Sequence, residues 1–282
     1  MSMTASTIVK TVSDLRQTVR AWRNSGSRIA LIPTMGALHP GHLSLVDLAK
    51  TRTDKAVVSI FVNPTQFAPH EDFNRYPRQL ERDVAALEGR ADLVFAPETR
   101  EMYPALSATR IQVEGPALGL ESDFRPHFFS GVATIVAKLL IVAEPDIAVF
   151  GEKDYQQLLV IKQLTRDLGL PVEIIAAPIL REHDGLAMSS RNAYLSPEER
   201  QIAGEMNRVL KDVSKKLRAG GTIATAEKDG VRGFLEAGFH SVDYVAVRDA
   251  EHLAVITGLA RPARILAAAK IGATRLIDNM AV

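Results

Sequence analysis

The 282-residue chain contains no cysteine and only one tryptophan, and aromatic residues make up 6% of it. The absence of cysteine excludes disulfides, thiolate zinc sites, iron–sulfur clusters and cysteine nucleophiles. Charge of one sign is lacking too, since 34 Lys and Arg residues face 33 Asp and Glu residues. A nucleic-acid surface usually shows a basic excess. The composition therefore predicts chemistry at oxygen and nitrogen groups and no nucleic-acid partner.

Long hydrophobic runs are also missing. The longest apolar stretch, residues 131–143, is interrupted by Lys138 and is shorter than the roughly 20 residues that a bilayer span requires. Residues 1–17 mix polar and charged side chains and do not resemble a secretory signal. We therefore expect a reduced, cytoplasmic protein without a membrane partner.

Several common catalytic fingerprints do not occur. No two glycines are separated by a single residue, so the GxGxxG dinucleotide loop is absent, and the Gly-Lys pair of a Walker loop never appears. The HExxH and GxSxG patterns are missing as well. Common hydrolase and P-loop interpretations therefore lose their main support.

What the chain does contain is a regular alternation of strand-like and helix-like segments. Short apolar runs predict strands at 29–32, 56–62, 93–96, 147–150 and 172–176. Apolar residues at helical spacing predict helices at 43–50, 80–87, 132–140 and 155–168. Strands that alternate with helices favour a mostly parallel sheet covered on both faces. The fold class predicted is α/β, a Rossmann-like doubly wound parallel sheet.

The pattern changes after about residue 178. A capping box, Ser196 to Glu199 with Pro197 at the first helical position, opens a long polar helix that runs to about residue 218. A helix at 225–237 and strand-like runs at 242–247, 264–271 and 274–278 follow. We therefore predict two domains, a nucleotide-binding domain at 1–178 and a smaller C-terminal α+β lid domain at 179–282.

The first candidate site directly follows the first predicted strand of the sheet. Ligands of open parallel sheets bind beyond the carboxyl ends of the strands, where helix N-termini offer N–H groups suited to phosphate. His39 and His42 would point toward the same anion, and Gly36 and Gly41 would let a nucleotide approach the backbone. A loop with two exposed histidines fits the pattern alone equally well. The segment comprises Met35, Gly36, Ala37, Leu38, His39, Pro40, Gly41 and His42.

Two further segments suit phosphate. Gly151, Glu152, Lys153 and Asp154 follow another predicted strand, where Lys153 could supply a positive charge. Met188, Ser189, Ser190 and Arg191 lie at the predicted domain junction, where two hydroxyls and a guanidinium could wrap a polyphosphate. Alone, the first could be a solvated Lys–Asp turn and the second a plain surface turn. Their shared placement at one sheet edge and one cleft favours a nucleotide site.

Amide and carboxylate side chains complete the candidates. Gln66 and Gln157 could bind a carboxylate and hydroxyls without adding charge, although each could equally be a surface glutamine. Asp83 and Arg78 lie on a helical stretch and by default belong to a solvated face. A carboxylate near a triphosphate could nevertheless hold Mg²⁺.

Five ordered motifs carry a resemblance to a known family. They are MGALHPGHLSLV, FVNPTQFAPHEDFNRYPR, SGVATIVAKL, PDIAVFGEKDYQQL and DGLAMSSRNAYLS. In this order and spacing they resemble the pantothenate synthetase family of the HxGH nucleotidyltransferase superfamily. The resemblance covers nearly the whole chain and weakens after about residue 200.

The resemblance implies a two-step reaction that uses ATP and Mg²⁺. The carboxylate of pantoate attacks the α-phosphorus of ATP, giving pantoyl adenylate and pyrophosphate, and β-alanine then displaces AMP to give pantothenate. A homodimer is also implied.

The resemblance implies roles for the candidate residues. Residues 35–42 line the ATP site, with His42 as proton donor and His39 beside it on the phosphates. Residues 151–154 also face ATP, with Lys153 on the phosphates, and Leu180 lies beside the nucleotide. Residues 188–191 form a mobile phosphate-binding segment that resembles the KMSKS loop. Gln66 and Gln157 bind pantoate, and Gln66 also β-alanine. No metal ligand is assigned.

The chain departs from the family pattern at one loop. The family usually has Arg-Pro-Gly-His-Phe before the Gly-Val of the long helix, whereas this chain has Arg125-Pro126-His127-Phe128-Phe129-Ser130-Gly131. The histidine is displaced by one place and the glycine is gone, so no role is assigned to His127.

Two other classes of protein compete with this interpretation. Another HxGH nucleotidyltransferase would release pyrophosphate but would not depend on β-alanine or require Gln66 and Gln157. A non-catalytic nucleotide-binding module would be expected to lose some phosphate-contacting residues, yet His39, His42, Lys153 and the Ser-Ser-Arg run are all present.

Overall fold

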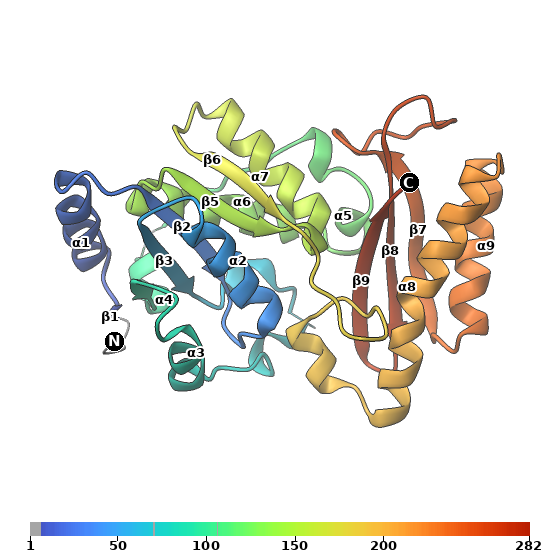
Figure 1. The fold of residues 1–282 in the computed structure, drawn as a ribbon, viewed down its shortest axis with the longest axis horizontal. Coiled ribbons are helices and arrows are strands. Elements are labelled where there is room, and N and C mark those ends of the chain that lie inside the picture. The colour runs from blue at the N-terminus through green and yellow to red at the C-terminus, as the bar shows by residue number, and fades with distance from the viewer. Residues whose placement is uncertain (1–6, 70, 106) are drawn as a thin grey trace.

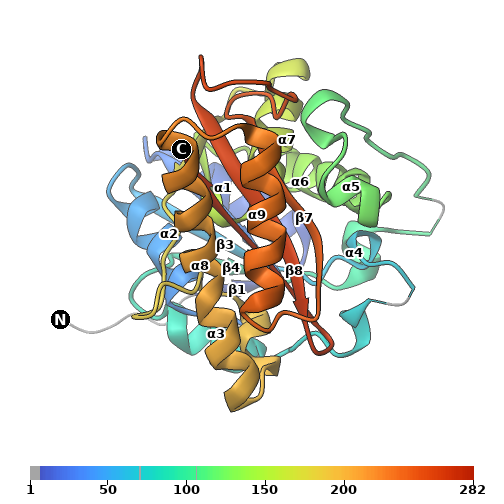
Figure 2. The ribbon, with the colours of Figure 1, turned by 90° about the vertical axis from the view of Figure 1, so that its right-hand side faces the viewer.

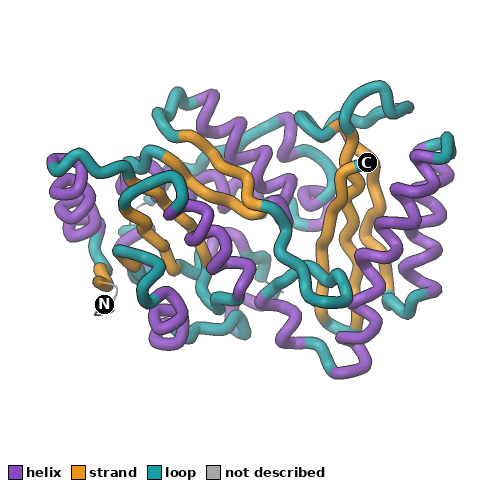
Figure 3. Tube along the Cα trace, viewed as in Figure 1, coloured by secondary structure: helices purple, strands orange, loops and turns teal. Residues whose placement is uncertain are grey.

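A computed structural model describes residues 7–69, 71–105 and 107–282. Its larger part is a six-stranded sheet in the order β1-β4-β3-β2-β5-β6, in which every strand pair is parallel. The strands are β1 (Thr7–Val9), β2 (Ile29–Thr34), β3 (Lys55–Ile60), β4 (Leu93–Phe95), β5 (Ile147–Gly151) and β6 (Glu173–Ala177). Figures 1 and 3 show this sheet with helices on both sides. The predicted doubly wound α/β fold is confirmed.

Two layers of helices cover the parallel sheet because its strands are apolar on both faces. α1 (Val12–Asn24), α6 (Phe128–Ala143) and α7 (Tyr155–Asp167) share one core cluster with Leu31, Val57 and Phe95. α2 (Pro40–Lys50) and α3 (Leu80–Leu87) share the cluster on the opposite face with Ile32 and Val58. Short helices α4 (Thr99–Met102) and α5 (Glu121–Phe124) lie in the connections.

The C-terminal part is a three-stranded antiparallel sheet backed by two helices. It contains α8 (Pro197–Arg218), α9 (Ile223–Glu236), β7 (Ser241–Asp249), β8 (Ala263–Ile271) and β9 (Thr274–Ala281), with strand order β7-β8-β9. The predicted capping box is present, since Ser196 Oγ accepts from Glu199 N at 3.2 Å and Glu199 Oε2 accepts from Ser196 N at 2.9 Å. The predicted α+β unit is thereby confirmed.

The small sheet has two different faces. Ile265 and Leu276 pack with Phe234 in the core under α8 and α9, whereas Leu266 and Ala246 form a separate cluster that includes Leu159 of α7. The small sheet therefore lies between its own two helices and the parallel-sheet part, as Figures 1 and 2 show. The last parallel strand ends at Ala177, next to the predicted domain boundary, which itself stays a prediction.

The sequence analysis assigned neither N-terminal element. β1 is three residues long and carries no apolar period of its own. α1, in contrast, has Leu15, Val19 and Trp22 at helical spacing and buries the first two, so its pattern could have predicted the helix. None of the helices in the described ranges is long and apolar enough to span a membrane.

Candidate active site

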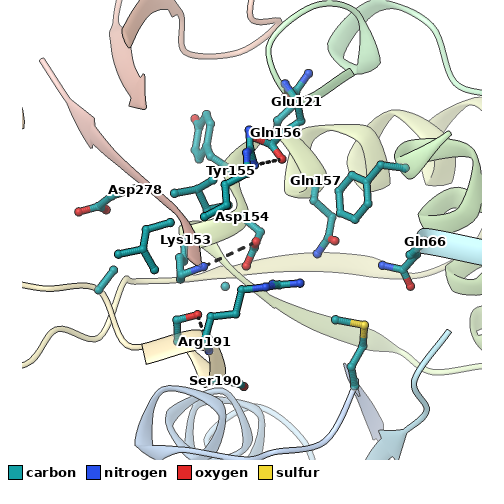
Figure 4. Close-up of a pocket in the computed structure, with 18 of the residues that line it drawn as sticks. Gln66, Glu121, Lys153, Asp154, Tyr155, Gln156, Gln157, Ser190, Arg191 and Asp278 are labelled. Atoms are coloured by element: carbon teal, nitrogen blue, oxygen red, sulfur yellow. Dashed lines mark hydrogen bonds and ion pairs between the residues drawn. The ribbon is translucent and has the colours of Figure 1, made fainter. Parts of the chain in front are cut away.

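A cleft of about 690 Å³ lies where the loops after β2 and β5 face the C-terminal sheet (Figure 4). Most of the residues predicted from sequence meet here. They are Met35, His39, Gly41, His42, Gln66, Gly151, Lys153, Asp154, Gln157, Leu180, Met188, Ser189, Ser190 and Arg191. The structure thus brings the three phosphate-suited segments and both glutamines to one cavity.

The histidine pair sits at the start of α2. His39 is the N-cap and Pro40 the first helical residue, where its missing N–H costs no hydrogen bond. The backbone N–H of His39 donates to Nδ1 of His42 at 3.4 Å, and the two rings lie 4.0 Å apart. Because Nδ1 accepts, the neutral ring of His42 carries its proton on Nε2. His42 is therefore set up as a hydrogen-bond donor.

Both imidazoles are held neutral. Burial, followed by the nearby Lys153 ammonium, lowers the pKa of His39 to about 4. Burial, His39 and Lys153 together lower the pKa of His42 to about 3. Neutral rings at pH 7 can donate hydrogen bonds, while Lys153 supplies the charge.

Asp83 corrects one expectation. It is not on a solvated face but is 1% exposed, and its carboxylate accepts from Ala37 N at 2.9 Å and from Leu38 N at 2.8 Å. These bonds hold the loop before α2, where Gly36 and Ala37 both adopt positive φ, 81° and 51°. Spacing could not reveal this, because the two segments are 45 or 46 residues apart.

The Lys153 loop forms a short 3-10 turn, Glu152–Asp154, between β5 and α7. Lys153 Nζ lies 3.9 Å from Asp154, and both side chains line the cleft. Both Glu152 and Lys153 offer their carbonyl oxygens to Asn279 of β9 at 2.9 Å. The C-terminal sheet therefore contacts this loop directly.

The Ser-Ser-Arg segment lies across the cleft from that loop. Ser190 Oγ donates to the Ala37 carbonyl at 3.0 Å, and the Arg191 guanidinium pairs with Asp72 through Nε and Nη2, each at 3.1 Å. Tyr76 lies under the same guanidinium, 5.9 Å from its ring centroid. Sequence reasoning missed Asp72 and Tyr76, whose only signal is their position in a family motif.

Gln66 and Gln157 approach from two different elements (Figure 4). Gln66 ends the 3-10 turn Pro64–Gln66, and its Oε1 accepts from Asn63 Nδ2 at 2.8 Å, so its own amide nitrogen remains as a donor. Gly131 of α6 allows this turn to approach, because a Cβ there would overlap the Thr65 carbonyl. Gln157 lies on α7.

Some predicted site residues do not line the cleft. His127, to which no role was assigned, is the exposed N-cap residue of α6 and lies outside the cleft as well. Five predicted nucleotide-binding residues are not among those that line the cleft, and their nucleotide contacts stay predictions. One of them, Glu152, pairs with Arg264 at 3.0 Å. Those five are Gly36, Ala37, Leu38, Pro40 and Glu152.

The acidic residues of the cleft differ in their partners. Glu71, Asp72, Glu121, Asp243 and Asp278 each form an ion pair with an arginine. Within the described ranges, Asp154 is the cleft carboxylate whose ion pair is with Lys153 alone, and its side chain is 44% exposed. Mg²⁺ bound with a nucleotide commonly takes one or two carboxylates besides phosphate and water. Asp154 fits that role, while no group of three or more potential ligands is preassembled in the described part of the chain.

The fold and the cleft together define an α/β protein whose strand-end loops gather cationic and hydroxyl side chains around a space suited to a polyphosphate. The chain itself belongs to the pantoate–β-alanine ligase family, because the family model matches residues 7–281.

Individual relatives agree with this membership over their full length. The pantothenate synthetase of Paramagnetospirillum magneticum is 56% identical over 280 residues, which is 99% of each chain. The crystal structure of pantothenate synthetase from Thermus thermophilus superimposes with a TM-score of 0.91 at 46% identity, covering 97% of this chain and 98% of that one. The Francisella tularensis enzyme, described as complexed with β,γ ATP and β-alanine, gives a TM-score of 0.81 at 34% identity and covers 98% of each chain.

Proposed function

We propose that this ligase condenses (R)-pantoate with β-alanine to form pantothenate, consuming ATP and releasing AMP and pyrophosphate. The observation that carries the proposal is that the HxGH turn, the Lys153 loop and the Ser-Ser-Arg segment share one cleft with two glutamine amides. Membership of the pantoate–β-alanine ligase family supports it independently.

In the first step a carboxylate oxygen of pantoate attacks the α-phosphorus of ATP. An O–P bond forms, the bond to the β-phosphate breaks, and pyrophosphate leaves. A carboxylate is already nucleophilic at neutral pH, so the step needs positioning and stabilisation of phosphate charge rather than an activated side chain. His39 and His42 donate as neutral rings, and Lys153 and Arg191 contribute positive charge.

Arg191 reaches phosphate by exchanging partners. In this structure its guanidinium pairs with Asp72 at 3.1 Å. A polyphosphate offers the same bidentate geometry with more negative charge. Nucleotide binding therefore replaces the Asp72 carboxylate at Arg191 with phosphate. Ser189 and Ser190 lie directly before Arg191 on the same segment.

Pantoate lies between Gln66 and Gln157 in this proposal. Amides recognise a carboxylate and hydroxyls without placing a second charge beside the reacting group. In the second step the amine nitrogen of β-alanine attacks the acyl carbon, a C–N bond forms, the C–O bond to AMP breaks, and the amine loses a proton.

Asp154 would hold Mg²⁺ together with the phosphate oxygens. When bound, the ion neutralises phosphate charge. We also propose that the protein acts as a homodimer, which sedimentation equilibrium of the purified chain tests directly.

The function is tested by omission. Purified protein is mixed with ATP, Mg²⁺, pantoate and β-alanine, and AMP is measured with each component left out in turn. We expect AMP only in the complete mixture and pyrophosphate only when pantoate is present. AMP formation that does not depend on pantoate or on β-alanine would contradict the proposal, whereas pyrophosphate release without any AMP would favour another HxGH nucleotidyltransferase.

A further inference from the structure

We propose that Asn279 of β9 is a positioning residue that fixes the Lys153 loop for adenylation. This inference rests on the proposed function. Asn279 bonds to the backbone of the loop after β5 and not to the Lys153 ammonium, so its effect would pass through that backbone.

The carboxamide of Asn279 joins the two parts of the molecule. Its Nδ2 donates to the carbonyls of Glu152 and Lys153, both at 2.9 Å, although β9 and this loop are 126 or 127 residues apart. Asn279 is 2% exposed, so water cannot readily replace these bonds. One side chain thus donates to the successive carbonyls of Glu152 and of Lys153, and Lys153 is the residue that carries the positive charge.

The orientation of this carboxamide follows from chemistry. Arg264 Nε donates to Asn279 Oδ1 at 2.6 Å, and a guanidinium can only donate. The two loop carbonyls can only accept. The oxygen of Asn279 must therefore face Arg264 and its nitrogen must face the loop, because the opposite arrangement would satisfy none of the three contacts.

Arg264 is itself held firmly. It is 9% exposed, its Nη2 donates to Glu152 Oε2 at 3.0 Å, and its guanidinium stacks 3.7 Å from the Tyr155 ring centroid. Arg264 therefore holds the side chain of Glu152 while Asn279 holds its backbone. The turn is fixed at both points, immediately before α7.

This double attachment matters because catalysis by charge depends on geometry. A displacement of about 1 Å of a group that acts on the transition state can cost about 100-fold in rate. The ammonium of Lys153 is itself weakly restrained, since its neighbour Asp154 is 3.9 Å away and partly solvated. Loss of the Asn279 bonds would let the turn relax and move Lys153 relative to the phosphates.

The test uses pantoate-dependent exchange between ATP and pyrophosphate, which reports the first step alone. Asn279→Ala is expected to lower the maximal exchange rate by about 10- to 100-fold, with the KM for pantoate changed by less than about threefold. Asn279→Asp keeps the shape and the Arg264 contact but turns an acceptor toward two carbonyls. It is expected to lose at least as much, whereas a packing role would leave Asn279→Asp active.

A double-mutant cycle separates positioning from general damage. If Asn279 acts through Lys153, then Asn279→Ala costs less than about threefold in a Lys153→Ala background. If Asn279→Ala lowers the exchange rate by the same factor with and without Lys153, the proposal is overturned. ATP binding measured by calorimetry provides a second readout, in which Asn279→Ala should weaken ATP but not adenosine.

The matched control is Leu253→Ala, which removes buried apolar contacts from the cluster that joins α7 to the C-terminal sheet without changing a residue of the cleft. It should lower the melting temperature without lowering the maximal exchange rate. If Asn279→Ala does not fold, Arg264→Gln, which leaves the carboxamide unanchored, replaces it. Wild-type protein without pantoate-dependent exchange would refute the proposed function, whereas active wild type with unchanged Asn279 variants would refute only this inference.

Discussion

The loops after β2 and β5 and the strand β9 meet at the same cleft with different chemistry. The loops present His42 and Lys153 to the cavity, while β9 contributes Asn279, which binds the backbone of the Lys153 loop. One region supplies groups that line the cavity, and the other binds the backbone that carries them. Groups of the first kind appear as short motifs in sequence, whereas groups of the second kind depend on contacts between distant segments.

The cleft loops and the C-terminal sheet also differ in how closely their cations pair with carboxylates. In the cleft loops, the carboxylate nearest to Lys153 among the described ion pairs is that of Asp154, at 3.9 Å. On the C-terminal sheet, Arg275 forms bonds of 2.8 Å to Glu121 and 2.7 Å to Asp243. The short ion pairs of Arg275 stabilise the assembly, whereas Lys153 lies farther from its carboxylate and can reach phosphate without breaking a short ion pair.

The largest expected effect is that of Lys153→Ala. Removal of one preorganised charge from a transition state typically costs about 10²- to 10³-fold, or roughly 3 to 4 kcal/mol. The measurement is pantoate-dependent pyrophosphate release. Lys162→Ala, at an exposed position of α7, is the control and should retain full activity. If Lys153→Ala released pyrophosphate at a near-normal rate, the cleft loops would no longer differ from the C-terminal sheet in supplying the charge for the reaction.

The histidine pair predicts a pH dependence of stability. Unfolded histidine binds a proton below about pH 6.5, whereas the folded-state pKa of His39 is lowered to about 4. The contribution of His39 to the free energy of unfolding is therefore fully present above pH 6.5 and is lost as the pH falls toward 4, by about 2 to 3 kcal/mol. Urea denaturation across this range measures the slope.

His39→Gln should flatten that slope, and His240→Gln should not. His240 is exposed just before β7 and serves as the matched histidine of the C-terminal region. If the free energy of unfolding depended equally on pH in the two variants, the pH dependence could not be assigned to His39 in the cleft.

A smaller loss of stability is expected for Gly131→Ala. The new methyl group would overlap the Thr65 carbonyl, so α6 and the turn bearing Gln66 must separate. Overpacking of this kind costs about 1 to 3 kcal/mol. Because Gln66 moves with the turn, the KM for pantoate should rise as well, which steady-state kinetics would detect.

The smallest effect, of opposite sign, is expected for Gly233→Ala on α9. Its Cβ would meet Val209 at 3.4 Å, an ordinary contact. Replacing a helical glycine where space exists stabilises by about 0.5 to 1 kcal/mol. Chemical denaturation should show this gain with unchanged catalytic rates, and any loss of activity would mean that α9 influences the cleft.

Most of the fold could be predicted because apolar periodicity and caps are local. The Ser196 box placed the start of α8 at the correct residue, and the strand at 147–150 differs from β5 by one position. β1 could not be predicted, since three residues paired with β4 carry no period of their own.

The residues of the candidate site likewise fall into those that a local motif predicts and those that depend on distant contacts. His39 and Lys153, predicted from strand-end loops, and Arg191, predicted from the domain junction, do line one cleft. The sequence wrongly placed Asp83 on a solvated face and carries no signal for Asn279, because each side chain binds backbone groups that lie 45 or more residues away in the chain. Residue type and spacing cannot show which distant N–H or C=O a buried side chain will meet.

The bonds from Asn279 also have a consequence for how the molecule is made. A ribosome adds roughly 5 to 20 residues per second, and domains tend to fold as they emerge. Lys153 and Asn279 are 126 residues apart, so roughly 6 to 25 s separate the synthesis of the turn from that of the strand that holds it. During synthesis, the parallel sheet can form well before the Lys153 loop acquires a fixed shape.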